Sequence, residues 1–118
     1  MNGYQYDISD NQKFVIYSAA EDREVVDVFL YDVETGKNKT ITNNEVGLEY
    51  DLAVSDSGDY AFVVRNRLES DYSYPILVIN GKEVENTRRD LYYSKLDFRD
   101  ENLYFVGNNL TREVFRVL

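Results

Sequence analysis

The chain of 118 residues contains no cysteine, no histidine and no tryptophan, and it has a single proline. Without cysteine it forms no disulfide and offers no thiolate, which leaves its redox compartment open. Without histidine it lacks the commonest general base and the commonest metal ligand. Sites of the Ser-His-Asp, Cys-His or zinc kind are therefore excluded within these residues. The sequence predicts that the chain is not an enzyme and that it carries no cofactor.

Positive charge and long apolar runs are also scarce. Thirteen basic residues stand against 22 acidic ones, which gives a net charge of −9 at pH 7. A chain this acidic repels phosphate groups, so nucleic acids and anionic membranes are disfavoured as partners. No apolar run approaches the ~20 residues that cross a bilayer. The first ten residues show neither the basic start nor the apolar segment of a signal peptide. We expect a soluble protein and leave its compartment open.

The most informative feature is an internal repeat. Three segments each combine a short strand, a polar turn with an aspartate, and an apolar strand. They are Tyr6–Ser18, Tyr50–Val64 and Ser94–Gly107. Their turn aspartates, Asp10, Asp56 and Asp100, are roughly 45 residues apart, which is the length of one propeller-type repeat. We therefore expect repeat units at about 4–45, 46–90 and 91–118 in one all-β domain.

Two glycine turns keep the same period. The sequence Glu34-Thr-Gly36-Lys favours a turn with glycine in the left-handed conformation, and Asn80-Gly81 is the strongest short hairpin signal. Between the turns, Val, Ile, Phe and Tyr indicate strands. The predicted strands are 4–9, 13–19, 25–33, 38–42, 49–55, 59–66, 75–80, 82–86, 92–98, 103–107 and 113–118. A helical turn within 18–29 is the alternative in that segment.

Several predicted strands are apolar on both faces. In the segment VVDVFLYDV, Val28 and Leu30 lie on one face, and Phe29 and Tyr31 lie on the other. Strands of this kind are covered on both sides. Because helical spacers are missing, stacked antiparallel four-stranded units explain the pattern best, which is the arrangement of β-propeller blades.

The segments DVFLYDVETGKNKTIT and EYDLAVSDSGDYAFVV resemble the TolB-like repeat of bacterial propellers, which also forms the propellers of prolyl-oligopeptidase-type enzymes. Residues 32–37 match its Asp-hydrophobe-Glu/Thr-Gly-Lys element closely, and residues 55–59 match its Ser-Pro-Asp-Gly-Lys turn loosely, because the proline is absent and Asp59 stands in place of the final lysine. The Gly-His and Trp-Asp dipeptides of WD repeats are absent. The resemblance implies loops that face protein partners and is compatible with a periplasmic or extracellular location.

The chain offers about two and a half units, whereas propellers usually close with four to eight blades. An open stack leaves apolar faces and strand edges in water. Three alternatives remain open: self-association, a place within a larger propeller, and a compact sandwich of sheets. The leading hypothesis is a non-catalytic protein-interaction or assembly module, and the alternative is an oligomeric carbohydrate-binding, lectin-like propeller.

Candidate contact residues are few. Tyr72, Tyr74, Tyr92 and Tyr93 fall near predicted loops or strand starts, where aromatic side chains stack on sugars or anchor a protein. Arg88 and Arg89 form a basic cluster that suits a ligand carboxylate or phosphate, or ordinary surface ion pairs. The run DLAVSDSGD is rich in the oxygen ligands that calcium prefers, but it lacks the EF-hand spacing. We therefore expect a self-capped hairpin turn there.

Overall fold

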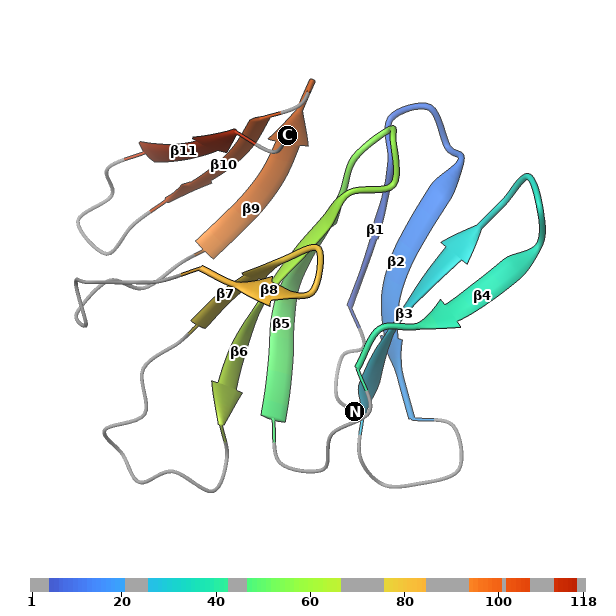
Figure 1. Cartoon of the computed structure of the whole chain (residues 1–118), viewed down its shortest axis with the longest axis horizontal. Helices are drawn as coiled ribbons and strands as arrows, with labels where there is room; N and C mark the ends of the chain where they lie inside the picture. Colours follow the sequence, from blue (N-terminus) through green and yellow to red (C-terminus); the bar gives the residue numbers. More distant parts are fainter. Residues whose placement is uncertain are drawn as a thin grey trace.

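The structure is a computed structural model that describes residues 5–20, 26–42, 47–66, 76–84, 94–100, 102–106 and 112–116. Within these ranges it contains eleven strands and no helix. The strands form three antiparallel sheets, none of which closes on itself (Figure 1). The prediction of an all-β chain is confirmed.

Each sheet is a meander of strands that follow one another in the sequence. Sheet A consists of β1 (Tyr6–Ile8), β2 (Phe14–Ala19), β3 (Asp27–Asp32) and β4 (Lys37–Thr40). Sheet B consists of β5 (Gly47–Val54), β6 (Tyr60–Asn66), β7 (Ile76–Ile79) and β8 (Lys82–Glu83). Sheet C consists of β9 (Ser94–Arg99), β10 (Asn102–Val106) and β11 (Arg112–Arg116). Every predicted strand overlaps an observed one, and each sheet falls within one predicted repeat unit.

The turns follow the sequence signals. Gly36 has φ +73°, Asn80 has φ +51° and Gly81 has φ +83°, so all three adopt the left-handed conformation that the turns require. Ahead of Gly36, Oδ1 of Asp32 accepts hydrogen bonds from two backbone N–H groups of the turn. The alternative prediction is a helical turn within residues 18–29. Both ends of that segment are strands, because β2 ends at Ala19 and β3 begins at Asp27. Residues 21–25 lie outside the described ranges.

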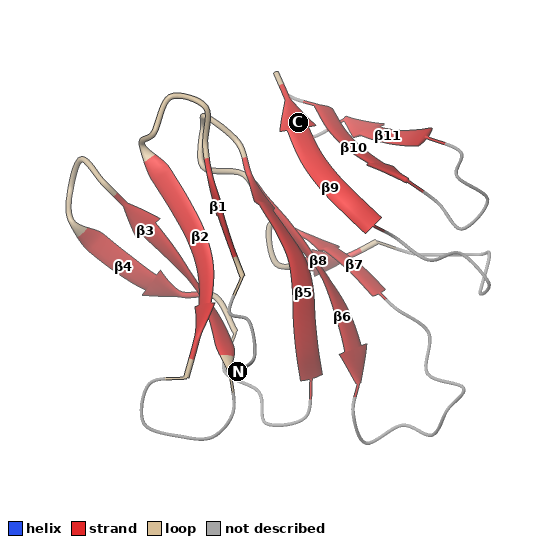
Figure 2. Cartoon of the chain, turned by 180° about the vertical axis from the view of Figure 1, so that it is seen from behind, coloured by secondary structure: helices blue, strands red, loops and turns tan. Residues whose placement is uncertain are grey.

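Sheet B lies between sheets A and C (Figures 1 and 2). The face of sheet B toward sheet A buries Leu52, Val54, Phe62 and Val78 in one cluster with Ile16 and Val28 of sheet A. Its opposite face buries Ala53, Ala61, Val63 and Leu77 in a second cluster with Leu96, Phe98, Leu103 and Phe105 of sheet C. The prediction that apolar strands are covered on both sides is thus confirmed for the sheet in the middle.

Apolar packing is the main source of stability in this stack. Burying one Val, Leu, Ile or Phe side chain contributes about 1.5–3 kcal/mol, whereas one hydrogen bond contributes about 0.5–1.5 kcal/mol net. Ile16, Val28, Val63, Leu77 and Leu103 are all completely buried. The polar contacts between sheets have a different effect, because they fix the position of one sheet along the next.

One such contact recurs at the inner edge of the stack. Oε1 of Gln5, next to β1, accepts the backbone N–H of Asp51 in β5 at 2.6 Å. Asp51 in turn accepts the backbone N–H of Leu96 in β9 at 3.2 Å through its own Oδ1. Gln5 and Asp51 each lie five residues before the turn aspartate of their unit. The same position of the first two units therefore binds the backbone of the unit that follows.

Both strands that donate their backbone N–H groups, β5 and β9, are irregular at this point. The pairing of β5 with β6 shifts between Tyr50 and Ala53, and the pairing of β9 with β10 shifts between Tyr104 and Val106. Asp51 and Lys95 have φ +61° and +56°. β-Bulges increase local twist and redirect side chains, and here they place Asp51 where its side chain reaches the next sheet.

The turn between β5 and β6 also contacts sheet A. A Cβ atom on Gly58, which has φ +90°, would lie 3.1 Å from Cζ of Phe14. Gly36 has a similar φ of +73°, but a Cβ atom there would meet nothing within 4 Å. Both glycines therefore require a left-handed backbone, but only at Gly58 would an added Cβ atom meet a neighbouring side chain.

We predict that Gly58→Ala destabilises the protein more than Gly36→Ala. The left-handed backbone costs a residue with a Cβ about 1–2 kcal/mol at either site. Crowding against Phe14 adds roughly 1 kcal/mol or more at Gly58 alone. Urea denaturation of both variants measures the difference, and Phe14→Leu in the Gly58→Ala background should reduce it. Equal losses in the two variants would show that the contact between this turn and sheet A is unimportant.

Candidate functional site

The six candidate contact residues from the sequence, Tyr72, Tyr74, Tyr92, Tyr93, Arg88 and Arg89, lie outside the described residues. Two other features of the described part of the chain can meet a ligand or partner. One is an acidic hollow among the three sheets, and the other is an aromatic face on the outside of sheet A.

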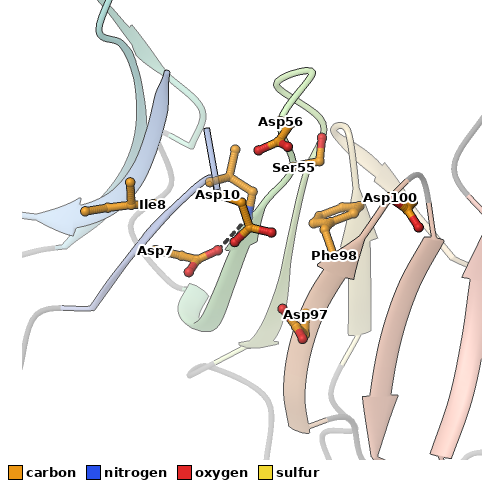
Figure 3. Close-up of a pocket in the computed structure, with 9 residues that line it drawn as sticks. Asp7, Ile8, Asp10, Ser55, Asp56, Asp97, Phe98 and Asp100 are labelled. Atoms are coloured by element: carbon orange, nitrogen blue, oxygen red, sulfur yellow. Dashed lines mark hydrogen bonds between the residues drawn. The ribbon is translucent and has the colours of Figure 1, made fainter. Parts of the chain in front are cut away.

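The acidic hollow has a volume of about 40 Å³ and lies where β1, β5 and β9 approach one another (Figure 3). Its lining consists of Asp7, Ile8, Asp10, Val54, Ser55, Asp56, Asp97, Phe98 and Asp100. Five of these nine residues are aspartates, and none is basic. The hollow is therefore a small region of concentrated negative charge.

The repeat explains why the carboxylates meet there. Asp10, Asp56 and Asp100 are the turn aspartates of the three units, and equivalent turns lie at the same end of stacked units. Asp7 and Asp97 each lie three residues before a turn aspartate. The three turn aspartates are recognisable in the sequence, but their convergence was not predicted; the signal for it is that equal positions of stacked repeats lie close together.

Hydrogen bonds hold the first two turns together. Oδ1 of Asp56 accepts the backbone N–H of Asn11 at 2.8 Å, and Nδ2 of Asn11 donates to the backbone carbonyl of Asp56 at 3.0 Å. Within the second turn, Oγ of Ser55 accepts the backbone N–H of Asp59 at 3.0 Å and that of Ser57 at 3.3 Å. The self-capped hairpin turn expected at residues 55–59 is confirmed.

Asp7 is the most constrained carboxylate of the hollow. Its Oδ2 accepts the backbone N–H of Val54 at 2.9 Å, which links β1 to β5. Burial raises the pKa of Asp7 above its ordinary value of 3.8, and the negative charges of Asp97 and Asp10 raise it further, while the hydrogen bond from Val54 opposes these effects. The balance shows that removal from water outweighs the hydrogen bond.

Two other aspartates differ in their surroundings. Burial also raises the pKa of Asp51, which the hydrogen bonds from the backbone of Leu96 and Lys95 oppose. Asp97 accepts a 2.7 Å hydrogen bond from Nε of Arg99, and this exposed ion pair raises the pKa of Arg99. Among the described residues, Arg99 is the only basic side chain that forms an ion pair with an aspartate of the acidic hollow. This ion pair lies on the solvent-exposed side of the hollow.

The hollow has room for a water molecule, which needs at least about 10–15 Å³. Among the residues that the structure describes, no group of three or more Asp or Glu side chains is placed to hold a metal ion. Asp51 belongs to the contact with β9 and lies apart from the Ser55–Asp59 turn. The oxygen-rich run DLAVSDSGD is therefore divided between two structural tasks.

The aromatic face lies on the side of sheet A that points away from sheet B. Pairing of β1, β2 and β3 places Tyr6, Tyr17 and Phe29 in one row, and Ile8, Val15 and Tyr31 in the next. Directly paired residues share a face, so these six residues define what we call the open face. Tyr6 is 70% exposed and Ile8 is 46% exposed, whereas Phe29 is buried and stacks on Tyr17 at 5.4 Å.

No protein-family model matches this chain, and no curated protein matches it. In the described residues, no helix has the length and apolar character that crossing a membrane requires. The resemblance to TolB-like repeats therefore stays a prediction, and the acidic hollow and the open face are the candidate functional surfaces.

We predict that Asp7→Asn raises stability near neutral pH. The amide keeps an acceptor for the N–H of Val54 and removes a half-buried charge beside Asp97 and Asp10. The gain should be below about 1 kcal/mol, because solvent screens partly exposed groups. In contrast, Asp7→Ala leaves the Val54 N–H without this acceptor and should lose about 1 kcal/mol.

The pH dependence of stability tests the direction of the pKa shift of Asp7. The pKa of Asp7 is higher in the folded than in the unfolded chain, so its protonation favours folding. This contribution is complete below the unfolded pKa of about 3.8 and is lost as the pH rises through the folded pKa. The advantage of Asp7→Asn over wild type should therefore shrink as urea melts move from pH 7 toward pH 4. A constant advantage would contradict this assignment.

Proposed function

We propose that this chain is a non-catalytic assembly module, built from propeller-type β units of the TolB-like kind, that associates with protein, copies of itself included. The observation that carries the proposal is the exposure of Tyr6 and Ile8 on the open face. Large aromatic side chains in a contiguous apolar row are typical of protein interfaces and rare on isolated surfaces.

The stack of sheets supports the propeller-type interpretation. Each unit is a meander whose strands follow in sequence order, and consecutive sheets pack face to face. Propeller blades have this arrangement. The chain has neither histidine nor cysteine, which supports a role without catalysis.

The carbohydrate-binding alternative depends on Tyr72, Tyr74, Tyr92 and Tyr93, which lie outside the described residues. The exposed aromatic residue that the structure does describe, Tyr6, shares a sheet face with Ile8 and Val15. A mixed aromatic and aliphatic surface of this kind suits another apolar sheet. This surface therefore favours the assembly function over carbohydrate binding.

We predict that wild-type protein self-associates with rising concentration and that Tyr6→Lys combined with Ile8→Lys weakens association. Each side chain that loses its burial costs about 1.5–3 kcal/mol, so Kd should increase at least about tenfold. Sedimentation velocity over a wide concentration range measures the masses of both proteins.

Val33→Lys is the matched control. Val33 is 45% exposed, close to the value for Ile8, but it lies in the turn after β3. This variant adds the same positive charge at the margin of the open face, beyond its two rows, and it should weaken association less than Ile8→Lys. A wild-type protein that stays monomeric at every concentration would overturn the proposed function.

A further inference from the structure

Two positions of the innermost strand are apolar in all three units. They lie four and two residues before the turn aspartate, and they are Tyr6 and Ile8 in sheet A, Leu52 and Val54 in sheet B, and Leu96 and Phe98 in sheet C. In sheets B and C these side chains are at most 8% exposed, since the preceding sheet packs over them. In sheet A the same positions are the exposed part of the open face.

The second strand repeats this relation. Ile8 pairs with Val15 in sheet A, Val54 pairs with Tyr60 in sheet B, and Phe98 pairs with Leu103 in sheet C. Leu103 is completely buried against sheet B, whereas Val15 is only half-buried. The open face thus has apolar residues in the same register as the two faces that pack against a preceding sheet, which points to another sheet as its occupant.

The outside of sheet C is the matching surface. Tyr104 and Val106 are half-buried on the face that points away from sheet B, and the half-buried Asp97, which pairs with Tyr104, lies at the inner edge of that face and also lines the acidic hollow. Asp97 occupies the position that Asp7 has in sheet A, three residues before the turn aspartate. Between sheets A and B, the Asp7 carboxylate accepts the backbone N–H of Val54, whose equivalent in sheet A is Ile8. The outer face of sheet C therefore has apolar side chains, and it has a carboxylate at the same position along the strand as Asp7 in sheet A.

We infer that the open face binds the outside of sheet C of a second copy of this chain, head to tail. This inference rests on the proposed assembly function and specifies its surfaces. A contact between different surfaces closes into a ring when the rotation per copy allows it. Two copies supply six sheets, which lies within the four to eight blades that close a propeller.

Pairing of two open faces is the competing arrangement. It would bury Tyr6 and Ile8 against their own copies, but it would bring no carboxylate to the position that Asp7 has between sheets A and B. Both junctions inside the chain instead join unlike faces, A to B and B to C. The head-to-tail contact continues this series.

A mixing experiment separates the arrangements. Ile8→Lys blocks the open face, and Tyr104→Lys blocks the outside of sheet C; Asp97→Lys is a second variant of that outer surface at a more exposed residue. Circular dichroism and urea melts establish that each variant folds. Each variant alone should show a Kd for self-association at least about tenfold weaker than wild type.

An equimolar mixture of the two variants, with one of them fluorescently labelled, should form a one-to-one complex. Its mass in sedimentation should be twice the 13.8 kDa of one chain, because the mixture contains one intact pair of surfaces. Mixing labelled Ile8→Lys with wild-type protein provides the reference for a partner whose surfaces are both unblocked.

The outcomes distinguish the inference from the function on which it rests. If Tyr104→Lys and Asp97→Lys associate like wild type while Ile8→Lys does not, the open faces pair with each other; the assembly function then stands and the head-to-tail contact is overturned. If the mixture of blocked variants stays monomeric, the head-to-tail contact is likewise overturned. A wild-type protein that never associates removes both.

Discussion

Burial of sheet B on both faces is the constraint on which the rest of this structure depends. Its strands alternate between side chains that contact sheet A, such as Phe62, and side chains that contact sheet C, such as Val63. A meander that is apolar on both faces exposes this surface to water unless other sheets cover it, and covering it is favourable. Sheets A and C therefore stabilise sheet B as much as they are stabilised by it, and the sequence order of the three units becomes their spatial order.

Apolar packing does not by itself fix the position of one sheet along the next, because it is non-directional. The hydrogen bonds from side chains of one unit to the backbone of the next supply that direction. Gln5 binds the N–H of Asp51, and Asp51 binds that of Leu96. Asp51 performs this task as a half-buried carboxylate with a raised pKa. A carboxylate in this place stabilises the register of the sheets at some cost in solvation.

The sequence was sufficient to predict the strands, the glycine turns and the approximate repeat, because each depends on local patterns such as the Asn80-Gly81 dipeptide. It was insufficient for the acidic hollow. That site forms only where the three units stack, and no local pattern shows that aspartates of different units meet there. The contacts between units at Asp51 were missed as well, because no local pattern marks Asp51 or Lys95 for a positive φ. The tyrosine and arginine candidates, chosen for residue type and for their place near predicted loops or in a basic cluster, stay predictions because they fall outside the described residues.

The two ends of the stack are chemically different, and this difference bears on how the chain assembles. The receiving positions stay apolar in every unit, from Ile8 to Val54 to Phe98. The opposite face changes along the chain: the completely buried Ile16 of sheet A and Ala61 of sheet B give way to the half-buried Tyr104 of sheet C. A surface that kept the interior composition would bind any apolar sheet, whereas a tyrosine beside Asp97 adds polar groups that require matched partners when buried. Selectivity of the contact would thus reside in sheet C, and the binding energy in the open face.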